Sequence, residues 1–111
     1  MAFKKTAELK GFNRIFSVSP EAKPYTLRDN GFVETKSGNH IYKRPLDSVN
    51  KAGLVLKVTI NKALNSLKIS TVNEKGLKAV DISKLEDNAM LVEKVNFIFD
   101  GFIDRDVLIE K

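Results

Sequence analysis

The feature that most constrains this chain is a change in the spacing of its apolar residues, which alternate with polar ones before residue 82 and follow a helical period after it. Alternation is typical of strands that bury one face of an antiparallel sheet. It predicts three consecutive strands, Leu54–Ile60, Leu67–Thr71 and Leu77–Ile82. From about Asn88 to Ile103 the apolar spacings become 3, 4 and 7, which indicates one amphipathic helix. We therefore predict a small α+β fold with this helix packed across the sheet.

The N-terminal half is expected to add strands and one short helix. The extended segments are Lys5–Leu9, Phe12–Val18 and a hairpin of Phe32–Lys36 with His40–Arg44. Tyr25–Asn30 is predicted to form one or two helical turns ended by Gly31, although Asp-Asn-Gly is also strong hairpin chemistry. The tail after Asp104 is expected to dock as a final turn or an edge segment. No repeat or linker divides the chain, so residues 1–111 are predicted to form a single domain.

Composition excludes several classes of protein. The 111 residues contain no cysteine, which rules out disulfides, thiolate catalysis and cysteine-ligated metals. The N-terminus has no apolar signal segment, and no stretch reaches the ~20 apolar residues that span a bilayer. We expect a cytoplasmic protein without a membrane segment.

Positive charge is concentrated in the first half of the chain. The net charge is +5, with 12 Lys and Arg against 5 Asp and Glu in residues 1–62, and 7 against 9 in residues 63–111. Such a basic half is suited to a nucleic acid, an acidic protein or a phosphorylated ligand, because summed positive potential attracts anions. The competing interpretation is an ordinary solvated surface, since the cations are scattered along the sequence.

No catalytic motif, metal-ligand spacing or phosphate-binding loop is present in the sequence, so we predict no catalytic residue, metal or cofactor. His40, the only histidine, is expected to be a partly exposed residue beside a turn. Four acidic residues near the end of the predicted helix have the oxygen ligands that magnesium prefers, but match no known loop spacing. These residues are Asp100, Asp104, Asp106 and Glu110, and we expect them to be solvated or salt-bridged.

The best candidates for an anion- or partner-binding site are cations and aromatic residues from the N-terminal half. If the hairpin packs beside the first strand, these side chains would converge on one sheet face. The candidate residues are Arg14, Arg28, His40, Tyr42, Lys43, Arg44 and Lys57.

Three segments carry a resemblance to a known family: Tyr25–Phe32, Ile41–Leu46 and Asn96–Phe102. Taken end to end, the chain is similar to a small uncharacterised family from lactic acid bacteria, a domain of unknown function labelled "putative amino-acid metabolism". The resemblance implies a TATA-binding-protein-like α+β fold, in which a long C-terminal helix packs on a curved antiparallel sheet, with a short helix near residues 24–30. It also implies an association with cysteine desulfurase genes, and hence with sulfur or amino-acid metabolism, and it identifies no catalytic residues.

Three functions are compatible with the sequence. The first is a non-enzymatic accessory protein that binds a partner protein, such as a cysteine desulfurase, or a small metabolite in sulfur or amino-acid metabolism. The second is an RNA- or tRNA-binding module that uses the basic half, and the third is an enzyme of unrecognised type that brings His40 and Tyr42 to a carboxylate. We expect a monomer, or a homodimer formed through an exposed edge strand.

Overall fold

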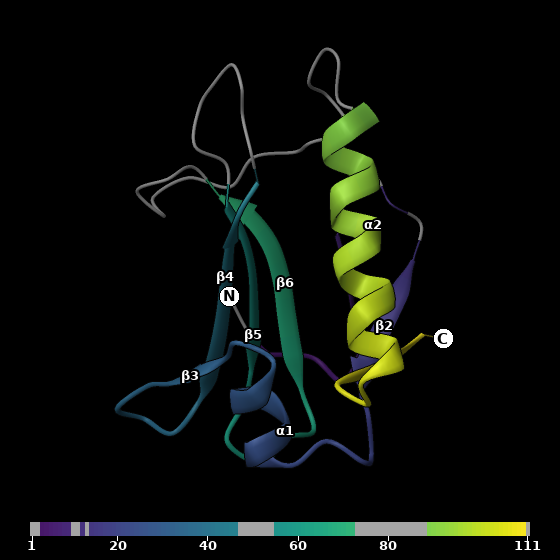
Figure 1. The fold of residues 1–111 in the computed structure, drawn as a ribbon. Coiled ribbons are helices and arrows are strands. Elements are labelled where there is room, and N and C mark those ends of the chain that lie inside the picture. The colour runs from purple at the N-terminus through teal and green to yellow at the C-terminus, as the bar shows by residue number, and fades with distance from the viewer. Residues whose placement is uncertain (1–2, 10–11, 13, 47–54, 73–88, 111) are drawn as a thin grey trace.

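The protein consists of two antiparallel sheets and two helices in the computed structural model, which describes residues 3–9, 12, 14–46, 55–72 and 89–110 (Figure 1). The four-stranded sheet has the order β3-β4-β5-β6, and the three-stranded sheet has the order β1-β2-β7. In chain order the elements are β1 Ala7–Glu8, β2 Ile15–Val18, α1 Pro24–Asp29, β3 Val33–Glu34, β4 His40–Pro45, β5 Val55–Ile60, β6 Leu67–Val72, α2 Ala89–Asp104 and β7 Leu108–Glu110. The predicted α+β class is confirmed, and the strands are divided between two sheets.

Strands β4, β5 and β6 form the regular part of the larger sheet, and their register confirms the alternation. Val58 of β5 lies opposite Tyr42 on one side and Ile69 on the other. The inward-facing residues of β5 and β6 are Leu56, Val58, Ile60, Leu67, Ile69 and Thr71, and all six are buried. The predicted strand Leu77–Ile82 lies outside the described residues.

Helix α2 supplies much of the core, as its spacing predicts. Its buried residues are Val95, Ile98, Phe99 and Phe102, while Leu91, Val92 and Ile103 are partly buried against the same core. The Phe99 ring lies 4.5 Å from that of Phe16 in the small sheet, and the Phe102 ring lies 4.9 Å from that of Tyr42 in the large sheet. The helix therefore joins the two sheets through its aromatic side chains. Neither described helix is long and apolar enough to cross a membrane.

The helix expected at Tyr25–Asn30 is present as α1, and Gly31 ends it. The Gly31 φ of +94° is in the left-handed region. The amide of Phe32 donates to the carbonyl of Leu27 at 3.0 Å, and that of Gly31 donates to the carbonyl of Arg28 at 3.2 Å. This is the Schellman arrangement that glycine favours. The Asp-Asn-Gly sequence therefore ends a helix here, and the hairpin follows it as β3 and β4.

Helix α2 ends in the same arrangement but without glycine. Asp106 occupies the left-handed position with φ +62°. The amide of Val107 donates to the carbonyl of Phe102 at 2.9 Å, and that of Asp106 donates to the carbonyl of Ile103 at 3.3 Å. The turn directs the chain into β7, where Leu108 pairs with Val18 of β2. The C-terminal tail thus becomes an edge strand of the small sheet.

Arg14 links the small sheet to α2 through hydrogen bonds, in addition to the aromatic packing. The guanidinium of Arg14 donates to both carboxylate oxygens of Glu110, to Asp100 Oδ1 at 2.8 Å and to Asn96 Oδ1 at 2.9 Å. Its carbon Cζ also lies 5.1 Å from the centre of the Phe16 ring. The side chain of Arg14 is only 19% exposed. Two of the four acidic residues near the end of α2, Asp100 and Glu110, therefore form salt bridges, and both bind Arg14.

We predict that Asp106→Gly stabilises the protein. A residue with a Cβ pays about 1 kcal/mol for the left-handed conformation, and a negative charge at a helix C-terminus is unfavourable. The expected gain is about 1 kcal/mol in the free energy of unfolding, measured by urea titration. Asp106→Asn isolates the effect of the charge.

The matched substitution at the end of α1 is expected to act in the opposite direction. Gly31→Ala places a Cβ at φ +94°, 3.2 Å from Cε1 of the Tyr42 ring. We expect a loss of about 1–2 kcal/mol in the same titration. A stabilised Gly31→Ala variant would contradict our account of both helix ends.

The Arg14 cluster predicts a pH dependence of stability. Hydrogen bonding to the Arg14 guanidinium lowers the pKa of Glu110 below its ordinary value of 4.5. Because the unfolded chain then binds more protons than the folded one at acidic pH, this contribution is present above pH 4.5 and is lost as the pH falls through the lowered pKa.

Arg14→Met removes both the contacts and this pH dependence. We expect a lower free energy of unfolding at pH 7 and a flatter stability profile below pH 4.5, measured by thermal unfolding at a series of pH values. Lys5→Met is the control, because Lys5 is exposed and forms no ion pair with the described residues. An unchanged acid profile in Arg14→Met would contradict the role of the cluster.

Candidate functional site

The face of the four-stranded sheet that points away from α2 carries the candidate site. Alternation along the strands places one set of residues on this side, and no described helix packs over it (Figure 1). We call this surface the outer face. Its members are Val33, Ile41, Lys43, Pro45, Val55, Lys57, Thr59, Lys68, Ser70 and Val72.

Two lysines lie directly opposite one another at the centre of the outer face. The register pairs Lys43 of β4 with Lys57 of β5. Residues opposite each other in an antiparallel pair have Cβ atoms about 5 Å apart, so two like charges in this position repel. The described residues provide no ion pair for either lysine. This part of the surface therefore has an uncompensated positive charge.

A third cation extends the positive surface towards the edge of the sheet. Lys68 of β6 lies opposite Thr59, which is two residues from Lys57 on β5. Its ammonium lies 5.1 Å from the centre of the Phe3 ring, within the range of a cation–π interaction. Lys68 is absent from the sequence-based candidates. Its position could have been predicted from the sequence. Leu67 and Ile69 face the core, so the residue between them in the strand lies on the opposite face.

The structure separates the other cations among the candidates. Arg14 is bound by the acidic residues of α2 and β7, on the small sheet. Arg28 is exposed on α1, at the end of the sheet where β4 begins (Figure 1). Arg44 is exposed next to Lys43, but its position in the strand alternation assigns it to the opposite face. Of the seven candidates, only Lys43 and Lys57 share the outer face.

His40 and Tyr42 belong to the inner side of β4, and the prediction for His40 is wrong. His40 is 7% exposed and lies opposite Ile60 of β5, on the side of β4 that faces the core. The Tyr42 ring is 8% exposed and packs against those of Phe32 and Phe102. Both side chains are therefore part of the core and cannot contact a partner at the surface. Neither forms a hydrogen bond with a carboxylate in the part of the chain that the structure describes.

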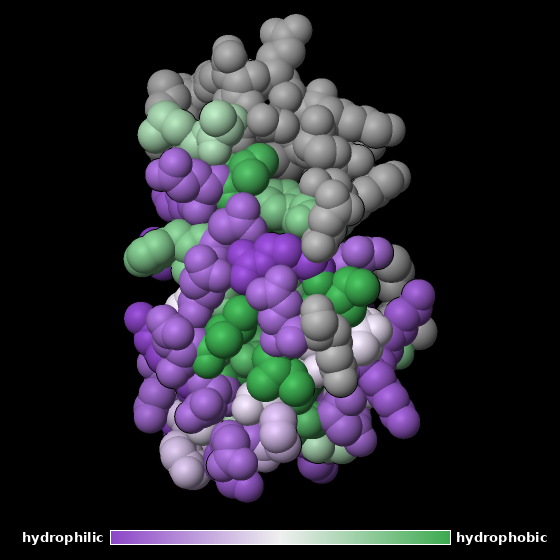
Figure 2. Space-filling view, turned by 90° about the vertical axis from the view of Figure 1, so that its right-hand side faces the viewer, coloured by the Kyte–Doolittle hydropathy of each residue, from purple (hydrophilic) through white to green (hydrophobic). Residues whose placement is uncertain are grey.

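The remaining residues of the outer face are mostly aliphatic. Val33 is 68% exposed, and Pro45 is exposed beside Lys43. The exposed aromatic residues of the described chain, Tyr25 and Phe97, lie on α1 and α2 instead. On the side of the molecule that carries α2, hydrophobic surface appears in separate patches between hydrophilic residues (Figure 2). The outer face thus combines lysines with aliphatic side chains and has no exposed aromatic platform among the described residues.

Comparison with known proteins identifies the family. A family model described as "DUF1831: Putative amino acid metabolism" matches residues 1–109. The crystal structure of a DUF1831 family protein from Lactobacillus plantarum superposes with a TM-score of 0.88, with 34% sequence identity over 100% of this chain and 99% of that chain. No curated protein matches the chain. The fold and the sequence together show that this chain belongs to the DUF1831 family.

Proposed function

We propose that this chain is a cytoplasmic, non-enzymatic accessory protein of amino-acid or sulfur metabolism that binds an acidic partner protein through the outer face. The observation that carries the proposal is the Lys43–Lys57 pair, which has no counter-charge among the described residues. Two facing lysines cost stability in the free protein. A carboxylate surface on a partner relieves this repulsion, so the pair favours an anionic partner.

The composition of the outer face favours a protein over a nucleic acid. Proteins that bind single-stranded nucleic acids stack bases on exposed aromatic side chains. The described outer face instead has Ile41 on one side of the Lys43–Lys57 pair and Val55 and Val72 on the other. Protein interfaces combine apolar side chains with charged ones, and the charges provide specificity and faster association. A cysteine desulfurase is the partner that the family resemblance suggests.

The test uses purified proteins and a matched pair of variants. Lys43→Gln/Lys57→Gln removes two charges from the outer face, and Lys5→Gln/Lys36→Gln removes two charges from exposed positions outside it. Binding to the cysteine desulfurase of the same organism is measured by calorimetry at low and physiological salt. We expect the first variant to bind at least about tenfold more weakly and the second to bind like the original protein.

Two outcomes would overturn the proposal. Equal weakening by both double variants would mean that only net charge matters. Binding of bulk tRNA but not of the desulfurase would establish an RNA-binding module instead. In that case, the slope of the logarithm of the binding constant against the logarithm of the salt concentration would decrease in magnitude by about 1 for each lysine removed.

A further inference from the structure

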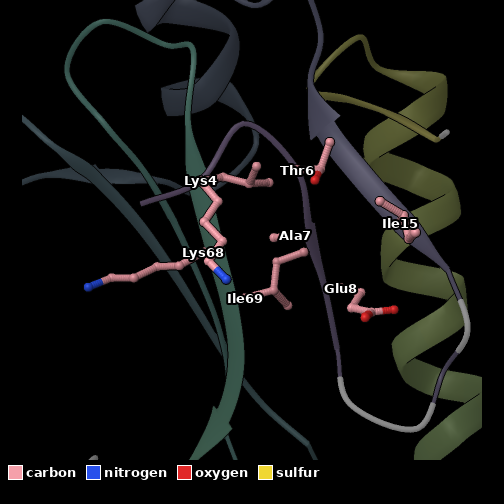
Figure 3. A pocket seen from close by; sticks show the side chains of 8 residues that line it. Lys4, Thr6, Ala7, Glu8, Ile15, Lys68 and Ile69 are labelled. Atoms are coloured by element: carbon pink, nitrogen blue, oxygen red, sulfur yellow. The ribbon is translucent and has the colours of Figure 1, made fainter. Parts of the chain in front are cut away.

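A groove between the two sheets borders the outer face at Lys68. It has a volume of about 330 Å³ and is formed where β1 passes beside β6 (Figure 3). Its apolar surface comes from Ala7 and Ile15 of the small sheet and from Leu67 and Ile69 of the large sheet. This volume is at the lower end of the range for ligand sites, which suits a small metabolite better than a nucleotide cofactor.

Of the three charged residues that line the groove, Lys4 and Glu8 are not paired with each other. Lys4 and Glu8 both line it and appear on opposite sides of Ala7 (Figure 3). Neither side chain has an ion-pair or hydrogen-bond partner among the described residues. Lys68 also borders the groove, but its side chain extends away from Glu8 and Ile15 (Figure 3). The groove therefore offers one cation, one anion and an apolar wall.

Backbone hydrogen bonds fix the positions of both charged residues. The amide of Lys4 donates to the carbonyl of Leu67 at 3.1 Å, and the amide of Leu67 donates to the carbonyl of Lys4 at 2.8 Å. Glu8 is paired with Ile15 in the small sheet. The backbone of Lys4 is thus bridged to β6 and that of Glu8 lies in β1, which lowers the cost of ordering the backbone around a ligand. Thr6 adds a hydroxyl group between them in the sequence.

We propose that this groove binds a free α-amino acid with an apolar side chain. The carboxylate of the amino acid pairs with the Lys4 ammonium, its ammonium pairs with the Glu8 carboxylate, and its side chain packs on Ile15 and Ile69. A zwitterion satisfies both protein charges at once, whereas a simple anion or a simple amine leaves one of them without a partner. The ligand class agrees with the description of the family, and the inference does not depend on the proposed partner of the outer face.

The test compares L-leucine with two analogues that each lack one charge. These are 4-methylpentanoate, which has no ammonium group, and 3-methylbutylamine, which has no carboxylate. Binding is followed by amide chemical shifts up to about 20 mM ligand, since a small exposed site is expected to bind in the millimolar range. We expect L-leucine to shift the signals of residues 4–8 and 67–69, and each analogue to bind at least about tenfold more weakly.

Variants locate the site and provide the matched control. Lys4→Met and Glu8→Gln are each expected to weaken L-leucine binding by at least about tenfold, because each removes one charged hydrogen bond. Lys5→Met and Glu21→Gln remove the same charges at exposed positions outside the groove and should leave binding unchanged. The proposal is overturned if L-leucine shifts no signal in the groove, if either analogue binds equally well, or if the control variants weaken binding as much.

Discussion

The structure depends on the aromatic contacts that α2 makes with both sheets. Phe99 packs on Phe16 of the small sheet, and Phe102 packs on Tyr42 of the large one. Each buried aromatic side chain removes a large apolar area from water, and paired rings add about 0.5–1.5 kcal/mol beyond that area. Because α2 occupies the inner side of the four-stranded sheet, every second residue of β4, β5 and β6 faces away from the helix. The outer face is a direct consequence of this packing.

Arg14 determines how the small sheet is attached to that core. Its guanidinium reaches α2 through Asn96 and Asp100, and it reaches β7 through Glu110. The carboxylates of Asp100 and Glu110 neutralise Arg14, which removes it from the positive surface. The cations that remain without an ion pair in the described sheet face lie on β4 and β5. The ion pairs of Arg14 compensate its charge at the small sheet, whereas the lysines of the outer face have no such compensation among the described residues.

The sequence predicted the elements whose pattern is local. The alternation in β5 and β6, the apolar stripe of α2 and the glycine at the end of α1 are each visible within a few residues, and all three are confirmed. The partners of Arg14 are 82 to 96 residues away along the chain, so no local pattern connects them. From the sequence, His40 is predicted to be partly exposed because it follows a turn. Its burial depends on Ile60 in the neighbouring strand, which the sequence of the hairpin does not contain.

Strand β6 links the two proposed sites, because its alternating residues serve both. Leu67 and Ile69 face the groove, and Lys68 between them belongs to the outer face. The same strand is bridged to Lys4 by two backbone hydrogen bonds. An amino acid in the groove would contact this edge of β6 through Ile69, whereas a partner on the outer face would contact the opposite side of the same strand. Binding of the partner and binding of the amino acid can influence each other only if a structural element that both contact has two conformations. Each ligand must then bind one of these conformations more tightly than the other. β6 is the element that both ligands contact, so any coupling between partner and amino acid is expected to pass through its edge at Leu67.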